Sequence, residues 1–236
     1  MTRRRWIADE FSSETASLLG ENAAHLARVL RARVGQQFDI ACGDVVRIGT
    51  VTSVADDRVE FSLGDIVVQA AEPELVLLMA IYKFDRMEWA IEKSTELGAT
   101  RIVPIIARRT DAHLAPAAAK RVERWRRIAH EAAQQSRRLR PPQIDPPEKL
   151  SSALATEAAT RLLLNEDEEQ LSFRDALGHA TSPLALAIGP EGGWTAEEIA
   201  QFAAAGWRSV SLGSRILRAE TAAIAALAIA AGFLDE

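Results

Sequence analysis

The stretch IGPEGGWTAEE, residues 188–198, places three glycines and a proline between an apolar run and a polar segment. The apolar run, residues 184–189, predicts a buried strand. Thr195 and Glu198 have the spacing of a capping box, which predicts that a helix begins directly after the loop. A strand, a glycine-rich loop and a helix in this order are typical of α/β domains, whose ligands bind at the carboxyl edge of a parallel sheet.

The glycines of this loop have two interpretations. Gly192 and Gly193 have no Cβ, so the backbone can approach a flat ligand there and present its N–H groups. The spacing matches neither the Walker loop nor G-x-G-x-x-G, and a phosphate or dinucleotide cradle is therefore not supported. The alternative is that the glycines only allow a tight turn between strand and helix.

A second stretch of the same character is LGSRILRAETAA, residues 212–223. It follows a predicted strand at 210–213 and precedes residues 222–234, which are apolar almost all round and are expected to form a helix buried on several sides. The charged residues Arg218 and Glu220 stand at the start of that helix. They are candidates for chemistry, with a surface ion pair as the alternative.

Around these stretches the sequence predicts two kinds of structure. From Glu74 onward, apolar runs alternate with segments of helical period, which indicates an α/β domain with a mostly parallel sheet. Asp85 is expected to cap one of these helices. Before residue 70 the apolar residues alternate as in strands, with one helix at 21–31, which favours a small β-barrel. The alternation changes phase near Gly49, which predicts a bulge or barrel corner.

The charge distribution bears on the choice of partner. The net charge of −5 argues against nucleic acid, but 24 of the 28 basic residues are arginines, and they cluster. Arginine is the side chain best shaped to bind phosphate with two hydrogen bonds. Clusters occur at residues 3–5, at Arg28 and Arg31, and at residues 120–140, so either RNA-binding surfaces or solvated helix faces are expected.

Compartment and metal content are predicted from what the sequence lacks. The single cysteine, Cys42, fits a reducing compartment. The histidines and the cysteine have no metal-ligand spacing, so no metal is expected. No secretory leader opens the sequence, and the apolar run 222–234 is too short to cross a membrane. A cytoplasmic protein is therefore expected.

Three motifs together resemble one family. They are GPEGG before a helix, L-G-S-R-I-L-R-A-E-T-A at residues 212–222, and E-K-S-T-E-L-G at residues 92–98. With H-L-A-R-V-L-R at residues 25–31, they resemble the RsmE family of SPOUT-class 16S rRNA (uracil-N3) methyltransferases. The resemblance extends along nearly the whole chain.

The resemblance implies a fold, a cofactor and partners. It implies a PUA-like RNA-binding β-barrel at residues 1–70 and a SPOUT methyltransferase domain with a trefoil knot at residues 74–236. It further implies S-adenosylmethionine (SAM) as methyl donor, 16S rRNA in the 30S subunit as substrate, and a homodimer. RNA binding is expected of the N-terminal arginines, namely Arg3, Arg4, Arg5, Arg28 and Arg31.

The resemblance also assigns the cofactor-binding residues. They lie in the two glycine-containing stretches and at the end of the strand at 161–165, and they are Leu164, Asn165, Gly189, Pro190, Glu191, Gly192, Gly193, Leu212, Gly213, Ile216, Leu217, Arg218 and Thr221. Ser214 and Ala219 differ from the family pattern in the cofactor loop. Residues 134–137 also differ from it, in a segment to which the resemblance then assigns no role.

The predicted catalytic residues are Arg218 and Glu220. Methylation of uracil at N3 removes the N3 proton and places negative charge on the flanking carbonyl oxygens, which a guanidinium such as Arg218 stabilises. Glu220 or Glu191 is expected to accept the proton. Three alternatives stay open, namely a SPOUT methyltransferase for another target such as a ribose 2′-OH, a non-catalytic ribosome-assembly factor, and a metabolic α/β enzyme with a nucleotide cofactor.

Overall fold

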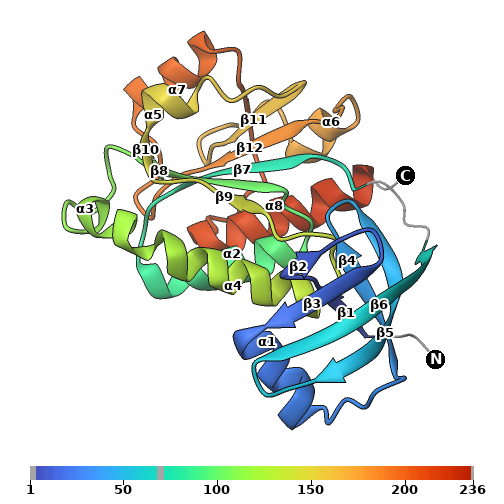
Figure 1. The fold of residues 1–236 in the computed structure, drawn as a ribbon. Coiled ribbons are helices and arrows are strands. Elements are labelled where there is room, and N and C mark those ends of the chain that lie inside the picture. The colour runs from blue at the N-terminus through green and yellow to red at the C-terminus, as the bar shows by residue number, and fades with distance from the viewer. Residues whose placement is uncertain (1–3, 68–71, 235–236) are drawn as a thin grey trace. The chain divides into compact units, whose positions relative to one another are not determined.

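The computed structural model describes residues 4–67 and 72–234, and the chain divides into two compact units. The first unit contains Met1–Ala71 and Ala133–Pro141, and the second contains Glu72–Ala132 and Pro142–Glu236 (Figure 1). None of the described helices is both long and apolar enough to cross a membrane. Arg3, one of the predicted RNA-binding residues, lies outside the described residues.

The first unit is a curled six-stranded sheet (Figure 1). Its strands, in spatial order, are β1 (Arg5–Ile7), β4 (Gln37–Cys42), β5 (Val45–Val54), β6 (Arg58–Val67), β3 (Thr15–Leu19) and β2 (Glu10–Phe11). All neighbours are antiparallel except β1 and β4. Leu18, Ile40 and Phe61 point to the inside of the curl and are fully buried, so the alternating sequence pattern marks the core face of each strand.

Gly49 lies where the ladder between β5 and β6 is irregular. The register shifts between Arg47 and Gly49 and again between Val51 and Ser53. A Cβ at Gly49 would overlap the side chain of Ile40, so glycine is required where the strand bends over the core. The predicted bulge is confirmed.

The helix predicted at residues 21–31 is present in a different form. A short α-helix, α1 (Gly20–Ala24), continues as a π-helical turn, His25–Val29. Arg31 then takes a left-handed backbone conformation with φ of 52°. Helical periodicity predicts a helix but does not distinguish an α-turn from a π-turn, because both place apolar residues on one side.

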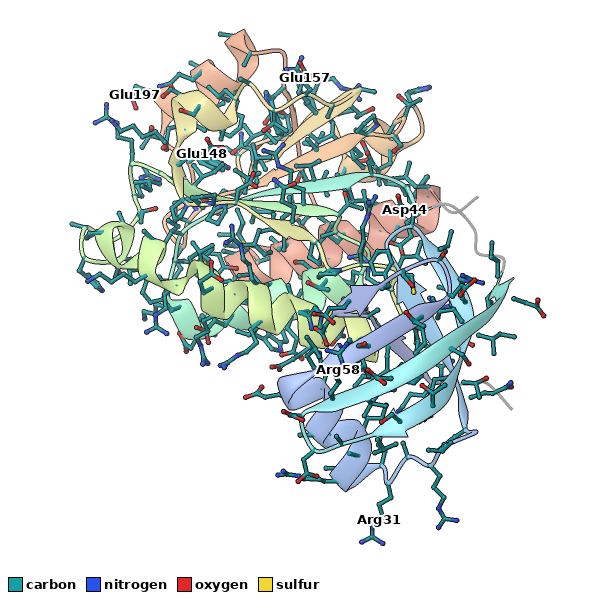
Figure 2. All side chains as sticks on the ribbon, in the orientation of Figure 1. Arg31, Asp44, Arg58, Glu148, Glu157 and Glu197 are labelled. Atoms are coloured by element: carbon teal, nitrogen blue, oxygen red, sulfur yellow. The ribbon has the colours of Figure 1, made fainter. Side chains whose placement is uncertain are left out.

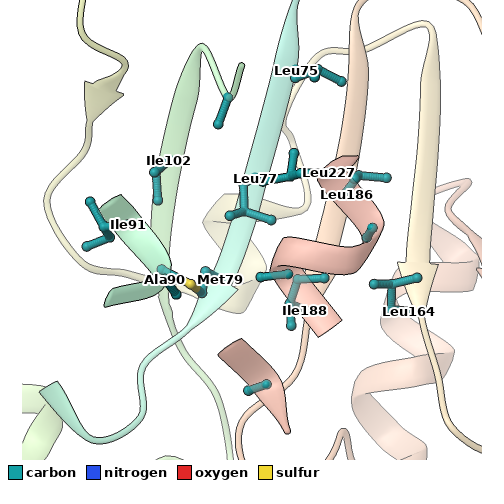
Figure 3. Close-up of a cluster of buried hydrophobic side chains, with 14 of the residues drawn as sticks. Leu75, Leu77, Met79, Ala90, Ile91, Ile102, Leu164, Leu186, Ile188 and Leu227 are labelled. Carbon is teal, nitrogen blue, oxygen red and sulfur yellow. The ribbon is translucent and has the colours of Figure 1, made fainter. Parts of the chain in front are cut away.

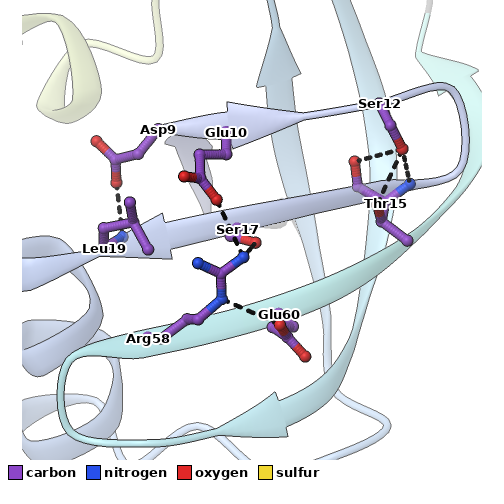
Figure 4. Close-up of polar contacts among 8 residues, drawn as sticks. All are labelled: Asp9, Glu10, Ser12, Thr15, Ser17, Leu19, Arg58 and Glu60. Atoms are coloured by element: carbon purple, nitrogen blue, oxygen red, sulfur yellow. Dashed lines mark hydrogen bonds and ion pairs between the residues drawn. The ribbon is translucent and has the colours of Figure 1, made fainter.

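Arg58 connects three strands of the first unit by polar contacts (Figure 4). Its guanidinium donates to Glu10 at 3.0 Å, to Ser17 at 2.9 Å and to Glu60 at 3.0 Å. The side chains of Arg58 and both glutamates are about half exposed, so each ion pair contributes at most about 1 kcal/mol. These contacts connect β2, β3 and β6 but add little to the free energy of unfolding.

The segment Ala133–Pro141 completes the first unit. Ala133 is fully buried in a cluster with Ile7, Ala41 and Val46. Arg140 forms an ion pair with Asp44 at 2.9 Å, and Arg5 donates a hydrogen bond to a backbone carbonyl of the same segment. Residues far along the chain therefore supply part of the packing of the N-terminal strands.

The second unit contains a parallel sheet. Its strands, in spatial order, are β10 (Glu148–Lys149), β8 (Arg101–Ile106), β7 (Leu75–Ala80), β12 (Leu184–Ile188), β11 (Thr160–Leu164) and β13 (Arg208–Val210), and β9 (Gln143–Ile144) also pairs with β8. Every neighbouring pair is parallel. The carboxyl ends of β12, β11 and β13 therefore lie at one edge of the sheet.

Helices cover both faces of this sheet (Figure 1). One face packs against α2 (Phe84–Glu96), α3 (Leu114–Ala118), α4 (Val122–Gln135), α6 (Phe173–Leu177) and α8 (Ala219–Leu234), and the other against α5 (Leu150–Ala153) and α7 (Ala196–Ala204). Leu75, Leu77 and Met79 of β7 point to the first face. Figure 3 shows Met79 beside Ala90 of α2. Burial on both faces explains why the strand sequences are continuously apolar.

The helix ends test two of the sequence predictions. The capping box at Thr195 and Glu198 is confirmed at the start of α7. The expectation that Asp85 caps α2 is wrong, because the residue before the helix is Lys83 and Asp85 lies within the first turn. Phe84 already belongs to the helix and packs against the core, which moves the start toward the N-terminus.

Candidate active site

A cavity of about 350 Å³ opens where β12, β11 and β13 end. The loops that follow these strands form its wall, together with the first turns of α7 and α8. Ten of the predicted cofactor-binding residues line it, namely Leu164, Asn165, Gly189, Pro190, Glu191, Gly193, Leu212, Gly213, Ile216 and Leu217. Parallel strands bring their carboxyl ends to one edge, which assembles these distant segments.

Four predicted site residues do not line the cavity. Arg218 is exposed and directly follows Leu217 of the cavity wall. Glu220 is buried behind the wall, and Thr221 is exposed on the first turn of α8. Gly192 lies at the tip of its loop and is exposed.

The glycine-rich loop is a tight turn, in which Gly193 N donates to Pro190 O at 2.8 Å. Its glycines are surrounded by side chains of the protein. A Cβ on Gly189 would come within 3.2 Å of the Trp194 indole, and one on Gly193 within 2.8 Å of the Glu166 carboxylate. Glycine is favoured at Gly193 mainly because its φ is +70°, and neighbouring side chains leave little free space at Gly189 and Gly193.

Gly213 is different from the glycines of the first loop. Its φ is +115°, which side-chain-bearing residues rarely adopt, and nothing lies within 4 Å of the position where its Cβ would stand. Gly213 also lines the cavity. Here the backbone itself faces open space, as expected where a ligand lies against the main chain.

Arg109 is a site residue that the sequence reasoning missed. It follows β8, lines the cavity, and donates through Nη1 to the carbonyl oxygens of Gly192 and Trp194. A neighbouring contact holds this segment in place, because Glu198 accepts from Arg108 N at 2.8 Å while its other oxygen accepts from Thr195 N at 2.9 Å. The capping box thus also anchors a third loop to the cavity.

Other missed residues lie next to predicted ones. They are Glu166 and Asp167 after β11, Trp194 after the glycines, and Ser211 and Arg215 within the second stretch. The useful signal was position, since each stands a few residues beyond the end of a parallel strand.

Behind the cavity, one arginine contacts two glutamates. Arg86 of α2 pairs with Glu191 at 2.8 Å and with Glu220 at 3.8 Å. Glu220 is only 5% exposed, and its Oε2 atom has no hydrogen-bond partner among the described residues. Burial raises the pKa of the neighbouring Tyr82 phenol above its usual value, and the negative charges of Glu220 and Glu191 raise it further.

The predicted RNA-binding arginines of the first unit have different surroundings. Arg28 forms an exposed ion pair with Asp56 at 2.8 Å, and Arg5 donates to the carbonyl of Arg137. Arg4 and Arg31 are exposed, and Figure 2 shows the Arg31 side chain extending away from the ribbon. Exposure and charge are compatible with phosphate contacts at these two residues.

Comparison with known proteins identifies the class of the second unit. The family model described as an RNA methyltransferase domain matches residues 70–231. The ribosomal RNA small subunit methyltransferase E of Synechocystis is 33% identical over 97% of this chain and 77% of its own length. The protein of the same name from Bacillus subtilis is 30% identical over 90% of this chain and 88% of its own length.

The structural comparison agrees over the whole chain. A crystal structure of ribosomal RNA small subunit methyltransferase E from Neisseria gonorrhoeae, bound to S-adenosylmethionine, superimposes with a TM-score of 0.85. It is 30% identical, and the match covers 99% of this chain and 98% of the other. The chain therefore belongs to the ribosomal RNA small subunit methyltransferase E family. The predicted fold class, a SPOUT-type α/β domain preceded by a β-barrel-like domain, is confirmed.

Proposed function

We propose that this protein transfers a methyl group from SAM to N3 of a uridine near the 3′ end of 16S rRNA, in the small ribosomal subunit. One observation carries the proposal. The cavity lies at the ends of β12, β11 and β13, and its glycine-containing walls belong to a chain whose whole length superimposes on a SAM-bound family member. Family membership supplies the substrate class.

The lining of the cavity fits SAM. Its volume of about 350 Å³ lies at the lower end of the range usual for small-molecule sites. Apolar side chains such as Leu164, Ile188 and Leu217 suit the flat adenine ring, and the bare backbone at Gly213 admits close contact. Arg109 and Glu166 supply the opposite charges that an amino-acid zwitterion requires.

When bound, SAM supplies an electrophilic methyl group, so the protein needs to position groups and to move one proton. Arg218 follows the cavity wall and is exposed, which suits stabilisation of charge on the uracil carbonyls. Of the two carboxylates, Glu191 stands in the cavity wall while Glu220 is enclosed behind it. Glu191 is therefore the first candidate for accepting the proton, and Glu220 helps to hold the cavity wall through its ion pair with Arg86.

Two partners belong to the proposal. The first unit binds the RNA backbone through exposed arginines, Arg4 and Arg31 foremost, with Arg3, Arg5 and Arg28 contributing. A second copy of the chain covers the apolar side of α8, where Ile229 is 40% exposed and Phe233 37% exposed. Large apolar side chains exposed on the outer side of a helix, such as these two, are typical of a subunit interface.

The proposal is tested by primer extension along 16S rRNA from cells with and without the gene. Methylation at N3 blocks the pairing edge of uridine, so reverse transcriptase stops there. We expect a stop near the 3′ end that disappears on deletion and returns with the wild-type gene but not with Arg218→Ala. Arg101→Ala, which breaks an ion pair with Asp145 elsewhere in the second unit, is the matched control and restores the stop.

The same RNA distinguishes the alternatives. Mass spectrometry of its nucleosides separates 3-methyluridine from a ribose-methylated nucleoside of equal mass by retention. A stop that persists after deletion contradicts the proposed target. Loss of a 2′-O-methylated nucleoside would instead assign the enzyme to another SPOUT specificity. Loss of neither modification, with binding to the 30S subunit retained, would support a non-catalytic assembly role.

A further inference from the structure

The two cofactor loops of the proposed methyltransferase belong to segments that share one cation. The GPEGG loop follows β12 and carries Glu191, and the loop after β13 leads into α8, whose first turn carries Glu220. Arg86 stands on a third element, α2, and its guanidinium reaches Glu191 at 2.8 Å through Nη1 and Glu220 at 3.8 Å through Nε. The two nitrogens point to different carboxylates, so one planar group bridges both segments.

The burial of the three groups shows which of them depends on the others. The side chain of Glu220 is 7% exposed, that of Arg86 30% and that of Glu191 38%. A buried carboxylate needs a nearby cation or several hydrogen bonds, and Glu220 has an oxygen without a hydrogen-bond partner among the described residues. Among the described residues, Arg86 is the cationic side chain that forms an ion pair with Glu220.

The charges of both carboxylates also act on a third group, the Tyr82 phenol. The pKa of the buried Tyr82 phenol is raised by the charges of Glu220 and Glu191, in addition to the larger effect of burial. Tyr82 lies in the segment between β7 and α2, and its hydroxyl contacts the Met79 sulfur at 3.2 Å. The negative charges thus converge on the start of α2, where Arg86 provides the compensating positive charge.

We propose that Arg86 is a positioning residue, which holds the two cofactor loops in their binding conformation by bridging Glu191 and Glu220. The inference rests on the proposed function, because it concerns affinity for SAM. Without Arg86, the Glu191 side chain is released from the cavity wall and the Glu220 carboxylate is left buried without its cation. Both loops then rearrange, and ligand binding has to restore their order.

Calorimetric titration of the purified protein with SAM tests this role. We expect Arg86→Gln to raise the Kd for SAM about tenfold, as loss of a partly buried charged hydrogen bond predicts. Arg86→Lys keeps the positive charge but not the planar guanidinium that reaches two carboxylates, and its Kd for SAM is expected to lie close to that of the wild type. The matched control is Arg124→Gln, which removes an equally short ion pair of 2.8 Å to Glu88 on the same helix, α2.

A readout without ligand separates this inference from the proposed function. Amide hydrogen exchange of the ligand-free protein is expected to rise in both loops of Arg86→Gln, at residues 189–193 and 212–218, while exchange in β4 to β6 stays as in the wild type. Arg124→Gln leaves both loops unchanged. If the wild type does not bind SAM, the proposed function is wrong, and the exchange data still decide the positioning role.

Two results would overturn the inference. One is an Arg86→Gln protein that binds SAM as tightly as the wild type and exchanges at the same rate in both loops. The other is a loss that Arg86→Lys does not relieve, accompanied by a matching loss of thermal stability and faster exchange throughout the second unit. That pattern would make Arg86 a general structural residue.

Discussion

Replacing Gly193 by alanine tests whether the left-handed backbone of the glycine-rich loop, more than the contact with a neighbouring side chain, requires a glycine there. Gly193 has φ of +70°, and its added Cβ would stand 2.8 Å from Glu166 Oε1. Gly192, the preceding residue, provides the matched comparison. It has no positive φ, and its Cβ would meet only the flexible Arg109 side chain, at 3.3 Å.

The expected cost has two parts. A left-handed conformation costs an alanine about 1–2 kcal/mol, and the reduced freedom of the unfolded chain returns about 0.5 kcal/mol, which leaves about 1 kcal/mol. The contact with Glu166 adds less than about 0.5 kcal/mol, because Oε1 ends an exposed, flexible side chain that can turn to another rotamer. Gly193→Ala is therefore expected to lower the free energy of unfolding by about 1 kcal/mol, and Gly192→Ala by less than about 0.5 kcal/mol.

Urea unfolding followed by tryptophan fluorescence measures both values. The double variant Gly193→Ala with Glu166→Ala separates the two parts, because it removes the contact and keeps the backbone strain. Relative to Glu166→Ala alone, the added alanine is again expected to cost about 1 kcal/mol, because the backbone strain remains. Equal losses for Gly192→Ala and Gly193→Ala, or a loss at Gly193 that Glu166→Ala abolishes, would refute the reasoning.

Three further predictions concern other parts of the chain. Tyr82 is the single tyrosine, and its pKa is raised in the folded protein. The folded protein therefore keeps the phenolic proton at a pH where the unfolded chain has lost it, which begins near pH 10. Above that pH the free energy of unfolding is expected to fall by about 1.4 kcal/mol per pH unit. Urea titrations at about pH 9 and about pH 11 should show this slope in the wild type and its loss in Tyr82→Phe. Arg31→Gly is expected to leave the melting temperature nearly unchanged, because glycine accepts the φ of 52°, while reducing the salt slope of RNA binding by about one. Glu198→Ala deprives two backbone N–H groups of their acceptor and should cost about 3 kcal/mol of unfolding free energy, with Glu198→Gln, which keeps one acceptor, costing about half.

The elements that could be predicted well from the sequence are those in which many residues follow the same hydrophobic period. The inner face of α4 carries five apolar residues at helical spacing, and all five are buried, namely Val122, Trp125, Ala129, Ala132 and Ala133. The parallel sheet follows from several apolar runs, each buried on both sides. In such segments an error at one residue does not change the outcome, because the period is set by the whole set.

The surroundings of the glycine loop could not be predicted in the same way. Arg109 reaches the loop because β8, β7 and β12 are neighbours in the sheet, and Glu166 reaches it because β11 lies on the other side of β12. Local patterns predict that a strand exists, but strand order is decided by packing of the whole unit. The site residues found from sequence were therefore those carried by motifs, and the residues that touch those motifs from other loops were missed.

The segment Ala133–Pro141 has a consequence for the order of synthesis. A ribosome making this chain releases the N-terminal strands first, yet the segment that buries Ile7 and Val46 and pairs with Asp44 begins 62 residues after Ala71 and ends 70 residues after it. At usual elongation rates this interval lasts roughly 3 to 14 seconds. During that time the nascent N-terminal sheet lacks part of its packing. A fragment that ends at residue 71 would lack these contacts permanently.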